Sequence, residues 1–161
     1  MNRADLTNEK PETVLLKQIT ARSTYLKSLV VSADPHEQGL RAILNYGHTV
    51  GHAIETVTNY EQWMHGEAVS VGMTAAGQIA RELGLMELNL LERQTDLLRD
   101  FGLPVSAPGL NPDAIIEAMS RDKKVVDGKA RFVLVTEIGK TIIHADVPDA
   151  LIRDAVQRVT R

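Results

Sequence analysis

Three histidines near the middle of the chain have the side-chain chemistry and the spacing of a metal site. His48 and His52 are four residues apart in a segment that we expect to be helical, so both rings face the same side, and His65 follows after a short linker. Neutral imidazole nitrogen suits zinc, and a catalytic zinc site typically has three protein ligands and one open position. The spacing favours two or three of these histidines as ligands and does not decide which. His36 and His144 show no partner pattern, so we interpret them as ordinary surface or hairpin residues.

A polar stripe accompanies the first two of these histidines on the helix expected over residues 40–58. Alternating steps of four and three residues trace two opposite faces of this helix. The polar face carries Arg41, Asn45, His48, His52 and Glu55, and the opposite face carries Ile43, Gly47, Val50, Ile54 and Val57. A solvated face normally carries Lys, Glu and Gln, whereas this one holds directional groups suited to a metal or a polyoxygenated anion. The simpler interpretation is that this is the solvent-exposed face of a surface helix, and these residue types make it the less favoured of the two.

Two glycines in the same expected helix add weight to a binding site. Gly47 and Gly51 lie in its interior, where glycine is destabilising by about 1 kcal/mol relative to alanine. We therefore expect something to approach the helix closely there. If the polar face lines a cleft, Asn45, His48 and His52 should be partly buried rather than splayed into solvent.

A second charged cluster follows the helix expected over residues 111–121. It consists of Arg121, Asp122, Lys123 and Lys124. Basic residues at a helix C-terminus complement the helix dipole and usually lie in water. The alternative is a cationic wall for a phosphate or a carboxylate. The sequence leaves both interpretations open.

The elements that would position these residues are mainly helical. Hydrophobic periodicity predicts a single domain over residues 1–161, a bundle of about six helices with one small antiparallel β-hairpin near the C-terminus. The helices are expected at residues 12–33, 40–58, 66–83, 87–101, 111–121 and 148–159, and the hairpin strands at 131–136 and 141–145. Asp34, Pro35 and Glu37 have the pattern of a capping box before the second helix. Small residues in the third helix favour close helix contacts.

Composition excludes several classes of protein. The chain has no cysteine, which excludes disulfides, thiolate metal sites and cysteine nucleophiles. Its 18 basic and 21 acidic residues leave a formal net charge of −3, and only 4% of residues are aromatic, which argues against a nucleic-acid binder. The N-terminal segment is polar, and no apolar run approaches the roughly 20 residues of a spanning helix. We therefore expect a cytoplasmic protein that binds neither nucleic acid nor a membrane.

The segment that carries the polar stripe resembles a known family. Residues 39–55 read GLRAILNYGHTVGHAIE, residues 65–69 read HGEAV, and residues 72–73 read GM. Together they strongly resemble the C-terminal domain of the 3-dehydroquinate synthases, sugar-phosphate cyclases of the shikimate pathway. The resemblance extends from Lys27 to residues 128–134 and so spans nearly the whole chain.

The resemblance implies an enzyme with two cofactors. The family converts 3-deoxy-arabino-heptulosonate 7-phosphate into 3-dehydroquinate and phosphate, using NAD and a divalent metal, usually zinc, with cobalt as an alternative. NAD transiently oxidises a ring hydroxyl, phosphate is eliminated, the ketone is reduced back, and the opened ring closes by an intramolecular aldol step. The implied partner is a small sugar-phosphate substrate. A homodimer is also implied, because family members are commonly dimers.

The resemblance also implies roles for individual residues. His48 and His65 match the two metal-ligand histidines of the family, and His52 would lie near the phosphate end of the substrate. The implied substrate-binding residues are Lys27, Arg41, Asn45, His52 and one of Lys123 or Lys124, of which Lys27, Asn45 and His52 are also the implied catalytic residues.

Two features of the family have no counterpart in this chain. The family's full chain is longer and begins with an NAD-binding α/β domain, whereas this sequence has no glycine-rich phosphate loop and no βαβ alternation. The family's third metal ligand is an upstream glutamate, and Glu9 and Glu12 stand in the wrong local sequence to match it. We therefore expect the metal- and substrate-binding half of the enzyme, inactive by itself and completed by the missing NAD-binding domain.

The sequence also allows functions other than this one. Aminocyclitol-forming and valiolone-forming cyclases share the fold, but they typically change the residues matched here by Arg41, Asn45 or His52. A standalone helical metal-binding domain would instead bind metal through His48, His65 and a local carboxylate such as Glu67. A purely structural or regulatory interaction domain would bind no metal, and changing His48 or His65 to alanine would not affect its function.

Overall fold

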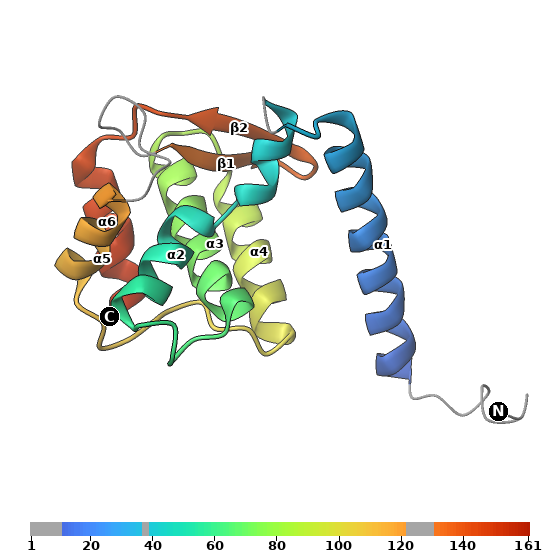
Figure 1. Ribbon diagram of the computed structural model, residues 1–161. Helices are drawn as coiled ribbons and strands as arrows, with labels where there is room; N and C mark the ends of the chain where they lie inside the picture. The colour runs from blue at the N-terminus through green and yellow to red at the C-terminus, as the bar shows by residue number, and fades with distance from the viewer. Residues whose placement is uncertain (1–10, 37–38, 122–130) are drawn as a thin grey trace, which may run out of the picture. The chain divides into compact units, whose positions relative to one another are not determined.

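The computed structural model describes residues 11–36, 39–121 and 131–161. Within these ranges it has six α-helices, one 3-10 helix and two strands (Figure 1). In chain order they are α1 (Pro11–Ala33), η2 (Leu40–Asn45), α2 (His48–Val57), α3 (His65–Glu82), α4 (Leu88–Asp100), α5 (Pro112–Arg121), β1 (Phe132–Glu137), β2 (Lys140–His144) and α6 (Asp149–Thr160). The expected class, mainly helical with one antiparallel hairpin near the C-terminus, is confirmed. None of the helices in the described ranges is long and apolar enough to cross a membrane.

The chain, interpreted from sequence as one domain, divides into two compact units, Met1–Leu44 and Asn45–Arg161. In the first unit, the buried Asp34 begins the 3-10 helix. Its Oδ2 accepts hydrogen bonds from the backbone N–H groups of Gly39 (2.8 Å) and Arg41 (3.0 Å). Asp34 therefore does cap a helix, but the helix begins at Leu40, and Pro35 lies in the preceding turn instead of at the first helical position.

The prediction of one continuous helix over residues 40–58 is wrong. The chain forms the 3-10 helix η2, turns at Tyr46 and Gly47, and starts again as α2. Gly47 has a φ of 79°, in the left-handed region that only glycine adopts readily. The predicted polar stripe is therefore interrupted, and α2 holds only its last three members, His48, His52 and Glu55.

The side chain of Tyr46 holds this turn in place. Its hydroxyl donates to Oε1 of Gln94 on α4 (2.6 Å) and lies 3.3 Å from the carbonyl oxygen of Met73 on α3. The side-chain amide of Gln94 in turn donates to the same Met73 carbonyl (3.1 Å). Burial raises the pKa of Tyr46 to about 12, and the hydrogen bond with Gln94 opposes part of that rise.

Helix α3 forms the centre of the second unit. It contacts α2, α4, α6 and β1, and Figure 1 shows it running between the neighbouring helices beneath the hairpin. Its buried side is rich in small residues, as the sequence predicts: Ala68, Ser70, Gly72, Ala75, Ala76, Gly77 and Ala80 lie there beside Val71, Thr74 and Ile79. Small side chains let the backbones of neighbouring elements approach closely.

The tightest of these approaches joins α3 to the start of α2. A Cβ atom on Gly72 would lie 1.9 Å from the carbonyl oxygen of Gly47, and one on Gly51 would lie 3.0 Å from the Cα of Val69. The close approach expected at Gly47 and Gly51 is therefore made by another helix. This contact sets the position of α2 relative to α3.

The hairpin and the last helix close the core around α3. Strands β1 and β2 pair in antiparallel register, with Phe132 opposite His144 and Glu137 opposite Lys140, and a turn at Gly139 joins them. Phe132 and Leu134 point into the core. The largest fully buried apolar side chains are Phe132, Ile54, Ile79, Ile115, Leu134, Val50, Val71, Val156 and Val159.

Alanine at position 72 should destabilise the fold strongly. The added methyl group would overlap a backbone carbonyl, which no side-chain rotation can relieve, so we expect Gly72→Ala to lower the free energy of unfolding by about 3 kcal/mol or more. Gly66→Ala is the matched control on the same helix, because no neighbouring atom lies within 4 Å of the position that its methyl group would take. Urea unfolding followed by circular dichroism compares them. Equal stability of the two variants would contradict the packing argument.

Tyr46 should make the fold sensitive to alkaline pH. A raised pKa in the folded state means that its stabilisation is complete below the ordinary phenol pKa, about 10, and is lost as the pH rises toward 12. The difference between a pKa of about 10 in the unfolded chain and about 12 in the folded chain corresponds to about 3 kcal/mol of folding free energy. We expect Tyr46→Phe to lose less stability than the unaltered chain between neutral pH and about pH 11 in urea unfolding. An identical loss in both chains would show that Tyr46 does not carry this dependence.

Candidate metal centre

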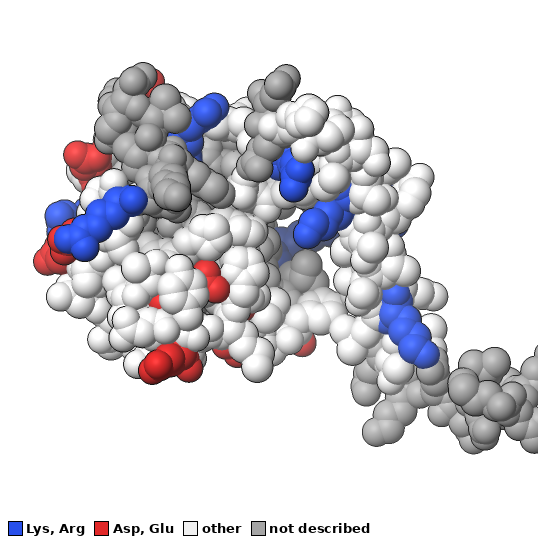
Figure 2. Space-filling view, viewed as in Figure 1, with Lys and Arg blue, Asp and Glu red and all other residues white. Residues whose placement is uncertain are grey.

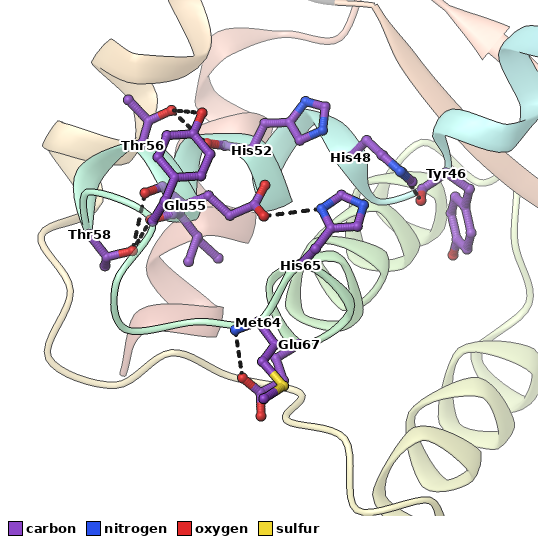
Figure 3. Close-up of polar contacts among 11 residues, drawn as sticks. Tyr46, His48, His52, Glu55, Thr56, Thr58, Met64, His65 and Glu67 are labelled. Carbon is purple, nitrogen blue, oxygen red and sulfur yellow. Dashed lines mark hydrogen bonds and ion pairs between the residues drawn. The ribbon is translucent and has the colours of Figure 1, made fainter.

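The structure brings His48, His52 and His65 together. Helix α2 supplies the first two, and the first residue of α3 supplies the third (Figure 3). Their possible ligand nitrogens all lie within 4.8 Å of one another, and the ring centroids are 5.2 to 5.8 Å apart. His48 and His52 are half-buried, as is Asn45, in agreement with the expectation that this polar face is not fully wet.

A backbone carbonyl fixes the ring of His48. Its Nδ1 lies 3.1 Å from the carbonyl oxygen of Tyr46. A carbonyl oxygen can only accept, so in the neutral ring the proton is on Nδ1 and the lone pair is on Nε2. The turn that holds Tyr46 between α3 and α4 therefore also orients His48.

A buried carboxylate fixes the ring of His65 in the same way. Nδ1 of His65 lies 3.1 Å from Oε1 of Glu55, and Figure 3 shows the carboxylate reaching from α2 to the ring. The Glu55 side chain is 8% exposed, whereas that of His65 is 57% exposed. The neutral ring again donates from Nδ1 and keeps its lone pair on Nε2.

Glu67, the local carboxylate considered for a standalone metal site, has a structural task. Its Oε2 accepts a hydrogen bond from the backbone N–H of Met64 (2.9 Å), at the start of α3. A carboxylate in the first turn also complements the helix dipole. Within the described residues, the group of side chains close enough to share a metal ion consists of three histidines and does not include Glu67.

A cavity of about 560 Å³ opens beside the histidines. Its wall is formed by Thr49, His52, Ala53, Glu55, Thr56, Tyr60, His65, Ala118, Met119 and Arg121, from α2, the following turn, α3 and α5. Arg121 is the described member of the charged cluster at residues 121–124, for which the sequence left open an anion site or a solvated helix end, and it pairs with Glu117 on its own helix. A cavity with histidine, hydroxyl and guanidinium groups in its wall can hold an anion.

The turn after α2 brings a tyrosine to this cavity. Asn59 and Tyr60 both have positive φ angles, 54° and 60°, which is uncommon for residues other than glycine. The backbone N–H of Tyr60 donates to the carbonyl oxygen of Glu55 (2.8 Å), and its hydroxyl lies 3.5 Å from Oγ1 of Thr56. This turn closes the C-terminal end of α2.

The remaining expected site residues lie elsewhere in the chain. Lys27 is exposed on α1 and Arg41 lies in η2, both within the first unit, whereas Asn45 is the last residue of η2 and belongs to the second. Lys123 and Lys124 are outside the described residues. The structure therefore brings together the three histidines of the predicted site. The substrate-binding roles of the other residues stay predictions.

Charged side chains are spread over the surface. On the described part of the second unit that faces the viewer in Figure 2, most Lys, Arg, Asp and Glu side chains lie toward the edges, and acidic atoms are also visible near the middle.

The comparisons with known proteins agree with this geometry. A family model described as "3-dehydroquinate synthase C-terminal" matches residues 2–125. The 3-dehydroquinate synthase of Nostoc punctiforme is 52% identical over 149 residues, which are 92% of this chain and 40% of that protein. The enzyme of the same name from Prochlorococcus marinus strain MIT 9312 is 47% identical over 150 residues, covering 93% of this chain and 41% of that protein. The chain thus spans about two-fifths of the length of the curated relatives it matches.

Solved structures of two related enzymes share the fold. A 2-epi-5-epi-valiolone synthase from Streptomyces hygroscopicus with NAD+ and Zn2+ bound superimposes with a TM-score of 0.78 at 26% identity, over 93% of this chain and 41% of that one. A 2-deoxy-scyllo-inosose synthase complexed with carbaglucose-6-phosphate, NAD+ and Co2+ gives a TM-score of 0.72 at 29% identity, over 83% of this chain and 39% of that one. The matched family model, the level of identity and the shared fold lead to one conclusion: this chain belongs to the 3-dehydroquinate synthase family and corresponds to the C-terminal part of that enzyme.

Proposed function

We propose that this chain is the metal- and substrate-binding part of an enzyme that converts 3-deoxy-arabino-heptulosonate 7-phosphate into 3-dehydroquinate and phosphate. The observation that carries the proposal is the convergence of His48, His52 and His65, two of which, His52 and His65, line a cavity. The relatives that are about half identical to this chain are 3-dehydroquinate synthases, whereas the solved structures of other cyclases are 26% and 29% identical. The retained Arg41, Asn45 and His52 also favour that activity over the other cyclases.

His48 and His65 are the proposed metal ligands, through Nε2. In metal sites, a ligating histidine almost always donates its other ring N–H to a carboxylate or a backbone carbonyl, and both of these histidines have such an acceptor. Two nitrogens bound to one tetrahedral zinc are about 3.3 Å apart, so small rotations of rings whose nitrogens lie within 4.8 Å would bring them to a zinc or cobalt ion. A bound metal ion supplies polarisation of the substrate oxygen that is oxidised.

His52 is the proposed contact with the phosphate end of the substrate. Its ring lines the cavity together with Arg121, so it can face both the metal ligands and a bound anion. Lys27, Arg41, Asn45 and one of Lys123 or Lys124 complete the proposed set of substrate-binding residues. Several fixed hydrogen-bond donors and cations would hold a substrate with a carboxylate and a phosphate in one pose.

The rest of the enzyme is the proposed partner of this chain. NAD, bound by that other part, supplies the reversible oxidation of the substrate. A cytoplasmic location and a homodimeric assembly are further proposals that rest on the family.

Metal binding should depend on two of the three histidines. We expect His48→Ala and His65→Ala each to weaken Co2+ binding by at least about tenfold, measured from the visible absorption of the bound ion during titration. His52→Ala should change the affinity much less. His144→Ala, in strand β2, is the matched control and should bind Co2+ as the unaltered chain does. A loss in His52→Ala as large as in His65→Ala would assign His52 to the metal instead.

Turnover should require the NAD-binding part. We expect the chain alone to release no phosphate from the substrate in the presence of NAD and Zn2+, and a fusion with the N-terminal part of the Nostoc punctiforme relative to do so. In that fusion, His52→Ala should lower kcat by about 100-fold or more, because His52 is the proposed catalytic contact with the phosphate group that leaves. NAD-dependent phosphate release by the isolated chain would contradict this division of the enzyme.

A further inference from the structure

Glu55 is a buried acidic side chain aimed at the metal centre, and neither the family resemblance nor the proposed ligand set gives it a role. We propose that Glu55 is a positioning residue, which holds His65 with Nδ1–H on its carboxylate and Nε2 turned toward His48 and His52. The expected effect of Glu55 on metal affinity rests on the proposed function. Its effect on the orientation of the His65 ring is independent of that function.

The difference in burial shows which partner positions the other. The side chain of Glu55 is 8% exposed and that of His65 is 57% exposed. A carboxylate buried in a packed helix has little freedom to move and requires a hydrogen-bond partner. An exposed ring at the first residue of a helix would otherwise sample several rotamers. The 3.1 Å contact between them therefore restricts His65 more than it restricts Glu55.

The backbone around Glu55 is held on both sides. Its carbonyl oxygen accepts hydrogen bonds from the N–H of Tyr60 (2.8 Å) and from Oγ1 of Thr58 (3.2 Å), which close the end of α2. One helical turn earlier, Gly51 packs against the backbone of α3 near Val69. The carboxylate is thus fixed relative to the helix that begins with His65.

Glu55 acts through His65 and is not a member of the ligand group. The side chains whose possible ligand atoms all lie within 4.8 Å of one another are the three histidines alone among the described His, Asp and Glu residues. Figure 3 shows one ring nitrogen of His65 on the carboxylate and the other on the side of His48. The carboxylate makes that second nitrogen the lone-pair donor.

The ring orientation can be measured without any metal. Long-range proton–nitrogen NMR spectra of the metal-free chain report the tautomer of each histidine, and His65→Ala identifies the His65 signals. We expect the neutral His65 ring to carry its proton on Nδ1, and Glu55→Leu to shift the population toward Nε2–H. Glu61→Gln is the matched control, because it removes an exposed carboxylate after α2 that does not contact the ring, and it should leave the tautomer unchanged.

The second readout is Co2+ affinity. We expect Glu55→Leu to weaken binding by about 10- to 100-fold, and Glu55→Gln, a neutral acceptor of similar size, by about tenfold. Glu55→Gln also serves if Glu55→Leu fails to fold. Glu61→Gln should bind as the unaltered chain does. In a His65→Ala background, Glu55→Gln should cause no further loss, because the effect passes through that ring.

Two results would overturn the proposal: a neutral His65 with its proton on Nε2 in the unaltered chain, or unchanged Co2+ affinity in both Glu55 variants while His65→Ala is impaired. If the proposed metal site itself is wrong, the measurements will show a different pattern. In that case His48→Ala and His65→Ala would bind Co2+ as the unaltered chain does, and the tautomer of His65 alone would decide the role of Glu55.

Discussion

The backbone contact between α2 and α3 is the constraint on which the candidate site depends. The carbonyl oxygen of Gly47 occupies the space where any other residue at position 72 would place its Cβ atom, and Gly51 lies against α3 one turn further on. Since α2 carries His48 and α3 begins with His65, the separation of the two helices determines the separation of the two rings. A metal centre built from side chains of different helices requires such a fixed approach, because an error of one ångström is large compared with a metal–ligand distance of about 2 Å.

Much of the fold could be predicted from the sequence, because its signals are local. Apolar periodicity and glycine or proline boundaries located every α-helix to within a few residues, except where the chain turns at Tyr46 and Gly47. That turn was missed because both segments continue the same hydrophobic period, and the reason for the break is not local. Gly47 has a positive φ, and the Tyr46 hydroxyl is bound to Gln94, almost fifty residues away. The glycines were correctly interpreted as a sign of close approach, although the approaching group is a helix and not a ligand.

The site was predictable to the extent that residue type and spacing define it. Histidines four residues apart on one helix must share a face, and a third histidine in the next linker could be suspected of joining them. The groups that orient the rings could not be identified in this way. One is the backbone carbonyl of Tyr46, which has no sequence signature at all. The other is Glu55, which stands on the predicted polar stripe but gains its role only because α3 places His65 within 3.1 Å of it.

The two orienting contacts have different origins, and this difference has a consequence for how the site is maintained. His48 is oriented by a carbonyl whose position depends on a neutral tyrosine held between α3 and α4, so its orientation is part of the hydrophobic core. His65 is oriented by the carboxylate of Glu55 on α2, so its orientation depends on a side chain in the wall of the cavity. Under the proposed function, both proposed metal ligands are therefore oriented by contacts within residues 45–161. The two rings can therefore be oriented before substrate or NAD is bound. Such preorganised ligands would hold a metal ion in one position, so that it polarises only an oxygen that the substrate places beside it.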